Sequence, residues 1–351
     1  MVFCHFGRLK RKTPASHPSA FAEQLSVWFR ANGRDYPWRR TTDPYAILVS
    51  EIMLQQTQIT TVLERGYYLR WMERFPDFKT LAAASEAEVL KAWEGLGYYR
   101  RAKNLQKLAL VVTNELSGVF PGDPEKIKPL PGIGPYTAGA IASFAFDQAQ
   151  PIVDGNVARV FSRLFNDATP IDSTAGKKIL WERADQLVRA SRSPREFNSA
   201  IMELGQTICR PTSPLCKECP VRSFCTTSKP ESLPVKQSRT QITEVTERVF
   251  FCETKAGILL EQETGTRRTG MWKLPALPEH VELPPVIHKS TYGITRYRVT
   301  LWVHQRPGKL PARAANHRRI TPDELHQLPM PSPYRKALQA AVDALRFELK
   351  A

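Results

Sequence analysis

The chain has 351 residues, of which 42% are hydrophobic and 24% charged, a composition typical of folded globular proteins and not of disordered ones. At this length we expect two domains. No apolar run approaches the roughly 20 residues that span a bilayer, so we expect no membrane association. Residues 1–19 are basic and lack a continuous hydrophobic stretch, so we expect an N-terminal tail and not a signal peptide.

Basic side chains outnumber acidic ones by 50 to 34, which gives a formal net charge of +16 and a pI near 9.7. Such an excess favours a polyanionic partner, because each Lys or Arg that reaches a phosphate releases counterions. Charge alone does not separate a nucleic-acid-binding protein from a soluble basic one.

Residues 20–208 carry one helical pattern after another. Asp43 is an N-cap followed by Pro44 at the first helical position, and apolar residues at near-helical spacing continue from Tyr45 to about Glu64. Further helices are expected over residues 86–93, 103–116, 136–146, 157–165, 175–190 and 196–207. No alternating strand pattern interrupts them, so the sequence predicts an all-α region.

After residue 228 the pattern changes. Residues 229–243 are rich in Ser, Pro, Lys and Thr and are typical of a linker. Beyond them, we expect strands at 249–252, 258–261 and 297–303, the last from its two-residue alternation. A capping box at Thr321 and a helix start at Ser332 follow. Residues 244–351 are therefore expected to form an α+β domain.

Two turns precede helices in the first region. Gly132 and Gly134, within Leu-Pro-Gly-Ile-Gly-Pro, predict a hairpin whose N–H groups and following helix N-terminus suit a DNA phosphate. A plain helix–helix turn would show the same pattern. Asp154 lies where a loop enters a helix, and the positive helix end favours an ionised carboxylate there. An ordinary N-cap is the alternative.

Glu51 lies inside an expected helix, with Ile47, Leu48 and Leu54 about one turn away. Apolar neighbours disfavour the charged form of a carboxyl group, so the pKa of Glu51 should rise and the group can hold a proton near neutral pH. A solvated glutamate at a polar seam is the alternative. The pKa values of Glu51 and Asp154 would then be shifted in opposite directions, giving one protonated and one ionised carboxyl, the pair expected for cleaving a glycosidic bond.

Four of the six cysteines fall within seventeen residues, at Cys209, Cys216, Cys219 and Cys225. This clustering indicates metal ligands in a reducing compartment and not a secreted disulfide scaffold. Four thiolates can hold a cubane iron–sulfur cluster or a tetrahedral zinc ion, and the presence of a single C-x2-C pair favours the cluster. We expect the ligand loop to span residues 209–228.

Together these motifs resemble the helix-hairpin-helix glycosylases of the endonuclease III superfamily, and more narrowly the MutY adenine glycosylases. The resemblance covers residues from about 20 to 228 and rests on the hairpin, the Val153–Asn156 stretch and the cysteine spacing. Residues 37–39, 50–58 and 270–275 carry the narrower likeness. It implies a helical catalytic domain with a [4Fe-4S] cluster on the four cysteines, followed by a Nudix-like domain.

The resemblance implies a monofunctional DNA glycosylase of base excision repair that removes adenine mispaired with 8-oxoguanine or guanine from double-stranded DNA. Glu51 would protonate the adenine, Asp154 would stabilise the sugar cation, and Tyr136 and Asn156 would support them. Bifunctional members carry a lysine at the position of Tyr136, so efficient strand cleavage is not expected.

The same resemblance implies residues that contact DNA. Arg34, Trp38 and Arg39 match positions near the adenine pocket. Gln56 and Tyr98 match residues that fill the gap left by the extruded base.

Three positions depart from the family pattern. Thr295, within Ile-Thr-Arg, is expected to read 8-oxoguanine, but the aromatic and imidazole side chains of the family tip are replaced by Ile294 and Arg296. A family Glu or Gln that contacts the base corresponds to Ser199. The acidic box of Nudix hydrolases is absent from the sequence, so recognition without pyrophosphate hydrolysis is expected.

We expect a monomer in the cytoplasm, associated with the nucleoid, as in bacterial relatives. The alternatives are a thymine or uracil mismatch glycosylase of the same fold and a non-catalytic iron–sulfur DNA-binding protein. The run from Glu51 to Gln58 and the long second domain weigh against the first. The presence of both Glu51 and Asp154 weighs against the second.

Overall fold

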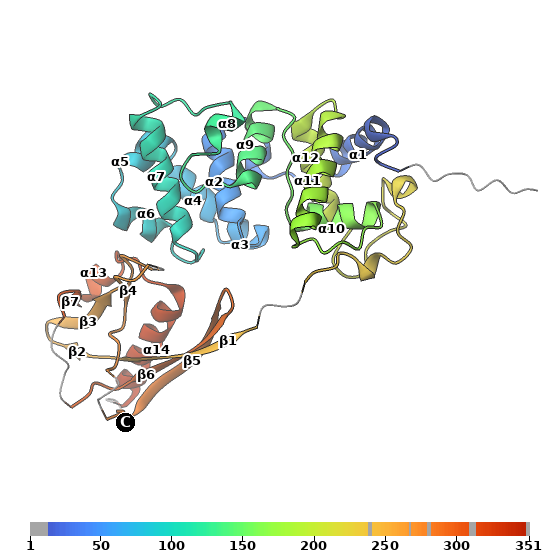
Figure 1. Ribbon diagram of the computed structural model, residues 1–351. Helices are drawn as coiled ribbons and strands as arrows, with labels where there is room; N and C mark the ends of the chain where they lie inside the picture. Colours follow the sequence, from blue (N-terminus) through green and yellow to red (C-terminus); the bar gives the residue numbers. More distant parts are fainter. Residues whose placement is uncertain (1–12, 238–240, 267, 279–281, 309–313, 349–351) are drawn as a thin grey trace, which may run out of the picture. The chain divides into compact units, whose positions relative to one another are not determined.

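The computed structural model describes residues 13–237, 241–266, 268–278, 282–308 and 314–348 (Figure 1). Two compact units share the chain, one made of residues 1–55 and 116–239, the other of residues 56–115 and 240–351. Among the described helices, none has the length and apolar character needed to cross a membrane.

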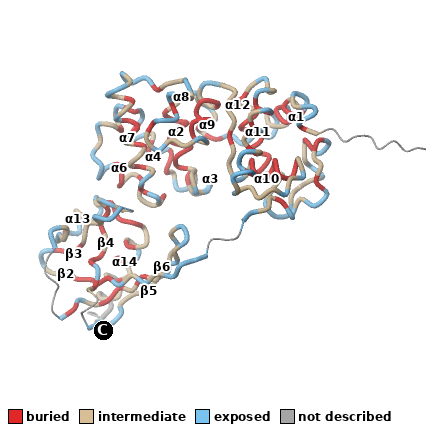
Figure 2. Tube along the Cα trace, in the orientation of Figure 1, coloured by how far each residue is buried: buried red, intermediate tan, exposed pale blue. Residues whose placement is uncertain are grey.

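The first unit is helical, as the sequence predicts. Its elements are α1 (Pro18–Asn32), η1 (Pro37–Arg39), α2 (Pro44–Leu54), α8 (Pro124–Ile127), α9 (Pro135–Phe146), α10 (Gly155–Leu164), α11 (Thr174–Arg189), α12 (Pro194–Thr207), η2 (Arg222–Phe224) and η3 (Pro230–Ser232). Helix α12 packs against α1, α9 and α10, and α9 also packs against α2. Figure 2 shows α2 and α9 with long buried stretches.

The core of this unit lies among α1, α10, α11 and α12. Phe21 of α1 meets Phe197 of α12 and Phe224 of η2 edge-on, with ring centroids 6.4 and 5.6 Å away. Three of the clustered cysteines pack partly buried against the same core. The apolar core therefore reaches the loop that carries the four cysteines and anchors one side of it.

Helix α2 ends earlier than the sequence predicts. The expected helix from Tyr45 to about Glu64 breaks after Leu54, and α3 (Ile59–Glu64) begins a new one. Every residue of α2 from Tyr45 to Met53 is buried. The four residues after Leu54 are polar, so continuing the same helix would bury uncompensated polar groups. The chain turns instead, and Gln56 takes a left-handed φ of +57°.

The second unit begins with the helices α3, α4 (Tyr67–Arg74), α5 (Phe78–Ala83), α6 (Glu86–Ala92) and α7 (Arg100–Asn114). Trp71 of α4 and Trp93 after α6 are both fully buried, and their rings meet edge-on at 5.2 Å. Ser85 caps α6 with a complete capping box that uses Glu88.

Strands form the rest of the second unit. One sheet has the order β1 (Thr243–Phe250), β6 (Tyr297–His304) and β5 (Val286–Ile294), with β1 parallel and β5 antiparallel to β6. The other contains β2 (Glu253–Thr254), β3 (Gly257–Gln262), β4 (Trp272–Lys273) and β7 (His317–Ile320). Helices α13 (Pro322–Leu325) and α14 (Ser332–Glu348) follow, and α14 packs on β5.

The strand positions agree with the sequence only in part. The capping box at Thr321, the helix start at Ser332 and the strand at 297–303 are confirmed. The strand expected at 249–252 instead runs from Thr243 to Phe250. Its first six residues are exposed or half-buried and give no apolar signal, because pairing with β6 and not burial holds them. The predicted domain boundaries themselves stay a prediction.

Helix α9 packs closely against the backbone at Pro151, and Gly139 allows this contact to be tested. A Cβ atom there would lie 2.3 Å from the carbonyl oxygen of Pro151. We expect Gly139→Ala to lower the free energy of unfolding by about 1–3 kcal/mol, because the backbone must move to relieve the clash. Urea denaturation would measure the loss. Gly155→Ala, where nothing lies within 4 Å of the new Cβ, is the matched control; an equal loss in both variants would contradict the packing.

Candidate active site

Asp154 is fixed at the entrance to α10 as an N-cap. Its carboxylate accepts a hydrogen bond from the backbone N–H of Val157 at 2.7 Å and one from the side-chain amide of Asn156 at 2.9 Å. The cap satisfies an otherwise unpaired helix donor and points one carboxylate oxygen toward Asn156. Asp154 therefore has a defined orientation before any ligand binds.

Glu51 projects from the buried helix α2 and is 6% exposed. Burial raises the pKa of the Glu51 carboxyl to about 7. A hydrogen bond with Tyr136 and the charge of Arg39 oppose this rise, and the negative charge of Asp154 adds to it. Near neutral pH the group is therefore a carboxylic acid in a substantial fraction of molecules, as the sequence predicts.

Tyr136, the second residue of α9, joins the two carboxyl groups. Burial together with the charges of Glu51 and Asp154 raises the pKa of the Tyr136 phenol well above its usual value. The hydroxyl also lies 3.8 Å from the sulfur of Met202 on α12. Helices α2 and α9 and the N-terminus of α10 thus bring Glu51, Tyr136 and Asp154 together, although the first and last of them are 103 residues apart in the sequence.

The two carboxyl groups are not shifted in opposite directions, and that prediction is wrong. Burial raises the pKa of Asp154 too, and this effect exceeds the opposing effects of the N–H of Val157, the amide of Asn156 and the charge of Arg159. The sequence shows the helix end but not how deeply the loop before it is buried. The two groups differ in the hydrogen bonds that oppose burial, which come from helix-end donors at Asp154 and from Tyr136 at Glu51.

Arg34, Trp38 and Arg39 lie on the same unit, in and around η1. Trp38 is 8% exposed and stacks on Tyr36 with ring centroids 5.2 Å apart. Arg39 donates to the backbone carbonyl of Arg34 at 2.7 Å. With Ser199, both arginines line a hollow of about 410 Å³. Arg34 and Arg39 therefore share one basic surface depression, which Trp38 does not line.

The predicted glycine hairpin lies between α8 and α9. Gly132 is exposed and takes a φ of +79°, which favours glycine. Gly134 is the N-cap of α9, and a Cβ atom there would meet nothing within 4 Å. The hairpin is confirmed as a turn before a helix N-terminus; its contact with a phosphate stays a prediction.

Gln56 and Tyr98 belong to the second unit and are both exposed, with left-handed φ angles of +57° and +49°. Arg101 links their two turns. It donates to the hydroxyl of Thr57 at 3.3 Å and to the carbonyls of Leu96 and Gly97 at 3.0 and 3.1 Å, and its guanidinium lies over the Tyr98 ring. The role of Gln56 and Tyr98 in filling a gap in DNA stays a prediction.

Thr295 lies in the turn between β5 and β6, where it is exposed and takes a φ of +51°. The neighbouring Arg296 lies over the Tyr297 ring and donates to its hydroxyl at 3.1 Å. The hairpin thus presents a hydroxyl and a guanidinium at its tip. Base recognition by Thr295 stays a prediction.

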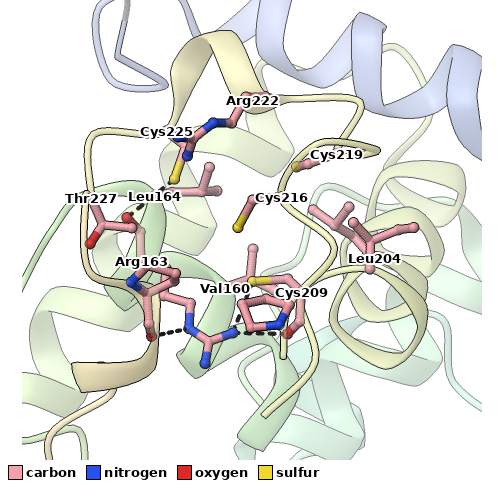
Figure 3. A pocket seen from close by; sticks show the side chains of 13 residues that line it. Val160, Arg163, Leu164, Leu204, Cys209, Cys216, Cys219, Arg222, Cys225 and Thr227 are labelled. Atoms are coloured by element: carbon pink, nitrogen blue, oxygen red, sulfur yellow. Dashed lines mark hydrogen bonds between the residues drawn. The ribbon is translucent and has the colours of Figure 1, made fainter. Parts of the chain in front are cut away.

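The four cysteines line one pocket (Figure 3). Apolar side chains of α10 and α12 form part of its wall, together with Arg163. Burial raises the pKa of the Cys219 thiol to about 12 and also raises that of Cys225, with the other cysteine charges adding to both. Such thiols need a compensating positive charge to act as thiolates.

No three potential ligands among the described residues converge closely enough for one metal ion. A tetrahedral zinc ion requires four sulfurs about 2.3 Å from a single centre. A polynuclear cluster takes one sulfur on each of its irons, so its ligands surround a wider space. Four cysteines that face a common pocket from separate directions therefore fit a polynuclear cluster better than a single zinc ion.

Sequence reasoning missed the buried arginines of α10. Arg159 donates to the side-chain oxygen of Asn156 at 2.9 Å and to the carbonyl of Cys209, also at 2.9 Å. Arg163 is 2% exposed and donates to Cys209 at both its carbonyl and its sulfur. The sequence signal that could have revealed these buried arginines is a pair of positive residues one turn apart on an otherwise apolar helix face.

Residues 49–186 match the family profile of HhH-GPD superfamily base excision DNA repair proteins. The chain is 48% identical over 216 residues to the adenine DNA glycosylase of Homo sapiens, covering 59% of this chain and 39% of the human protein. It is 35% identical over 258 residues to the adenine DNA glycosylase of Buchnera aphidicola subsp. Baizongia pistaciae, covering 72% of this chain and 71% of that protein.

A solved thermostable thymine-DNA glycosylase is 31% identical to this chain, with a TM-score of 0.55, covering 61% of this chain and 97% of that one. The chain spans only 39–41% of the length of the mammalian relatives that it matches.

The raised pKa of Glu51 predicts how stability depends on pH. Because the folded state binds this proton more tightly than the unfolded state, the stabilisation is present below pH 4.5 and is lost as the pH rises through 7. Glu51→Gln imitates the protonated form and does not titrate. The difference between its free energy of unfolding and that of the natural chain should therefore rise by about 2–3 kcal/mol between pH 5 and pH 8, in favour of the variant. Urea denaturation at both pH values would measure it. Exposed Glu64→Gln is the control, and a pH-independent difference for Glu51→Gln would contradict the prediction.

Proposed function

The chain belongs to the adenine DNA glycosylase family of helix-hairpin-helix base excision repair proteins, and on that premise we propose that it removes adenine mispaired with 8-oxoguanine or guanine from double-stranded DNA. The observation that carries the proposal is the buried Glu51 acid beside Tyr136 and Asp154. The net charge of +16 supports a nucleic acid partner.

In the proposed reaction, Glu51 gives its proton to N7 of the extruded adenine as the bond between base and sugar breaks. Adenine then leaves as a neutral base, and Asp154 stabilises the positive charge that develops on the sugar. Water adds to the sugar carbon and its proton passes to the Glu51 carboxylate, leaving an abasic site and restoring the acid. The fixed cap geometry supports this role for Asp154, since a preorganised carboxylate needs no reorientation during the reaction.

Tyr136 supports base removal without strand cleavage. A phenol cannot form the Schiff base through which a lysine amine opens the sugar and nicks the strand. Its position against both carboxyl groups suits it to orient them. The product would therefore be an intact strand with an abasic site.

We also propose that Cys209, Cys216, Cys219 and Cys225 hold a [4Fe-4S] cluster. When bound, this group cross-links the loop through its metal–thiolate bonds and supplies the positive charge that the buried thiols lack. Arg163, which donates to Cys209, would orient that ligand. A reducing compartment such as the cytoplasm suits unpaired cysteines of this kind.

We propose that the C-terminal strands form a Nudix-like domain that recognises the mismatch. The mixed sheet, in which β1 runs parallel to β6, and the helix α14 that packs on it support the likeness. The exposed Thr295 hydroxyl at a hairpin tip suits contact with the base opposite the adenine. Arg296 beside it offers donors to the acceptor atoms of an ordinary guanine, which favours activity on both mispairs.

Single-turnover assays on duplexes would test the reaction. We expect adenine release opposite 8-oxoguanine and opposite guanine, none of thymine opposite guanine, and strand breaks only after alkali treatment. Glu51→Gln should lower the rate by about 10²–10⁴-fold, because the variant cannot donate the proton. Exposed Glu64→Gln is the matched control. Release of thymine, or prompt nicking without alkali, would reject the proposed activity.

The cluster can be tested by metal analysis of protein purified without oxygen. We expect about four irons and four acid-labile sulfides per chain. Cys219→Ser should lose most of the iron and lower the melting temperature, since metal binding contributes to folding of the loop. Cys252→Ser is the control, because this buried cysteine lies in the other unit. Stoichiometric zinc in place of iron would overturn the assignment.

A further inference from the structure

Glu203 of α12 is an acid that the proposed reaction leaves unexplained. Its side chain is fully buried. The Arg39 guanidinium lies 2.9 Å from one carboxylate oxygen and that of Arg34 lies 3.5 Å from the other. Neither oxygen has a well-directed hydrogen bond, so the attraction is mainly Coulombic. A buried carboxylate without hydrogen bonds costs stability, which indicates a role other than stabilising the fold.

Glu203 completes a set of contacts that hold Arg39 from several sides. The guanidinium lies over the rings of Phe29 and Tyr36, 5.1 and 4.7 Å from their centroids, and donates to the carbonyl of Arg34. From the other direction, Arg195 of α12 donates to the carbonyl of Arg39 at 3.0 Å. The ion pair with Glu203 and the hydrogen bond from Arg195 therefore join Arg39 to α12, and the other contacts hold its guanidinium from other sides.

The charge of Arg39 reaches the catalytic acid. It lowers the pKa of Glu51, opposing the rise that burial produces. An unbalanced guanidinium would favour the ionised form of Glu51 and so remove the proton that adenine must receive. The negative charge of Glu203, in contact with the guanidinium, opposes that effect.

We propose that Glu203 is a positioning residue of the reaction: it holds the Arg39 guanidinium and offsets its charge, so that Glu51 keeps its proton. The inference rests on the proposed function. The charged and titratable groups that face Glu51 are Tyr136 from α9, Asp154 from the start of α10 and Arg39 from η1. Glu203 acts on the last of these and touches no reacting atom.

The test is the pH dependence of single-turnover adenine release from a duplex with adenine opposite guanine. Because the protonated form of Glu51 is the active one, the rate falls as the pH rises through its pKa. Glu203→Gln should move the midpoint of this fall down by about one pH unit, since it leaves the charge of Arg39 unbalanced. Glu203→Asp keeps the negative charge, so its midpoint should stay close to that of the natural chain.

Arg39→Gln should shift the pH midpoint in the opposite direction, so the proposal can still be tested if Glu203→Gln does not fold. Removing the guanidinium should move the midpoint up, and the double variant should return it toward the natural value. Glu182→Gln, which removes an exposed acid of α11, is the matched control. Slower release by the same factor at every pH, with fixed midpoints, would reduce Glu203 to a structural role and overturn the proposal.

A second readout separates this inference from the activity on which it rests. The side-chain carboxyl of Glu51 can be titrated by ¹³C NMR in labelled protein, with Glu51→Gln assigning the resonance. If the natural chain releases no adenine from any duplex, the proposed function fails. The Glu51 midpoint in Glu203→Gln still decides the electrostatic role: a downward shift supports it, and an unchanged midpoint refutes it.

Discussion

The burial of a single carboxyl group on α2 is the constraint on which the site depends. Every residue of that helix from Tyr45 to Met53 is buried, and Glu51 is the one acid among them. Removing a carboxylate from water is unfavourable, so burial favours the protonated, uncharged form of Glu51 near neutral pH. A positive charge near the buried Glu51 favours its ionised form, and Arg39 lowers the pKa of Glu51 in this way. Glu203 pairs with Arg39, and we propose that this pairing offsets the effect.

Helix α10 connects this chemistry to the cysteine loop. Asp154 caps its N-terminus, and Arg159 and Arg163 follow one turn apart on the face that meets Cys209. Asn156 lies between, donating to Asp154 and accepting from Arg159. A loop that shifts at Cys209 would move Arg159 and through it Asn156. One short helix therefore fixes the orientation of the carboxylate and the position of the loop at once.

Local signals in the sequence predicted local structure well. Asp43 and Thr321 are caps whose mechanism needs only the next three residues, and each caps a helix as expected. Asp154 also caps a helix, which the sequence allowed as the alternative for that residue. The helix break after Leu54 was missed because apolar spacing resumes at Ile59 once the polar run ends. Strand β1 was misplaced because its pairing partner lies some fifty residues away.

The site needed information of another kind. Nothing in the neighbourhood of Glu51 or Asp154 says that they meet, and resemblance to a family supplied that expectation. Glu203 gave a signal that could have been read, since it is a lone acid between Ile201, Met202 and Leu204 on an otherwise apolar stretch. Its partners, however, lie more than 160 residues earlier. Only the packing of η1 on α12 makes that acid part of a charge balance.

Backbone strain provides an independent pointer to function in the second unit. Gln56, Tyr98 and Thr295 are exposed, yet each takes a left-handed φ that costs a non-glycine residue about 1 kcal/mol or more. Glycine at these positions would relieve the strain, and no apolar core is gained by avoiding it. Strained, exposed turns that carry side chains fit the prediction that Gln56 and Tyr98 contact DNA. For Gln56 and Tyr98, whose turns Arg101 holds together, a gap in stacked bases is a partner of suitable size and chemistry.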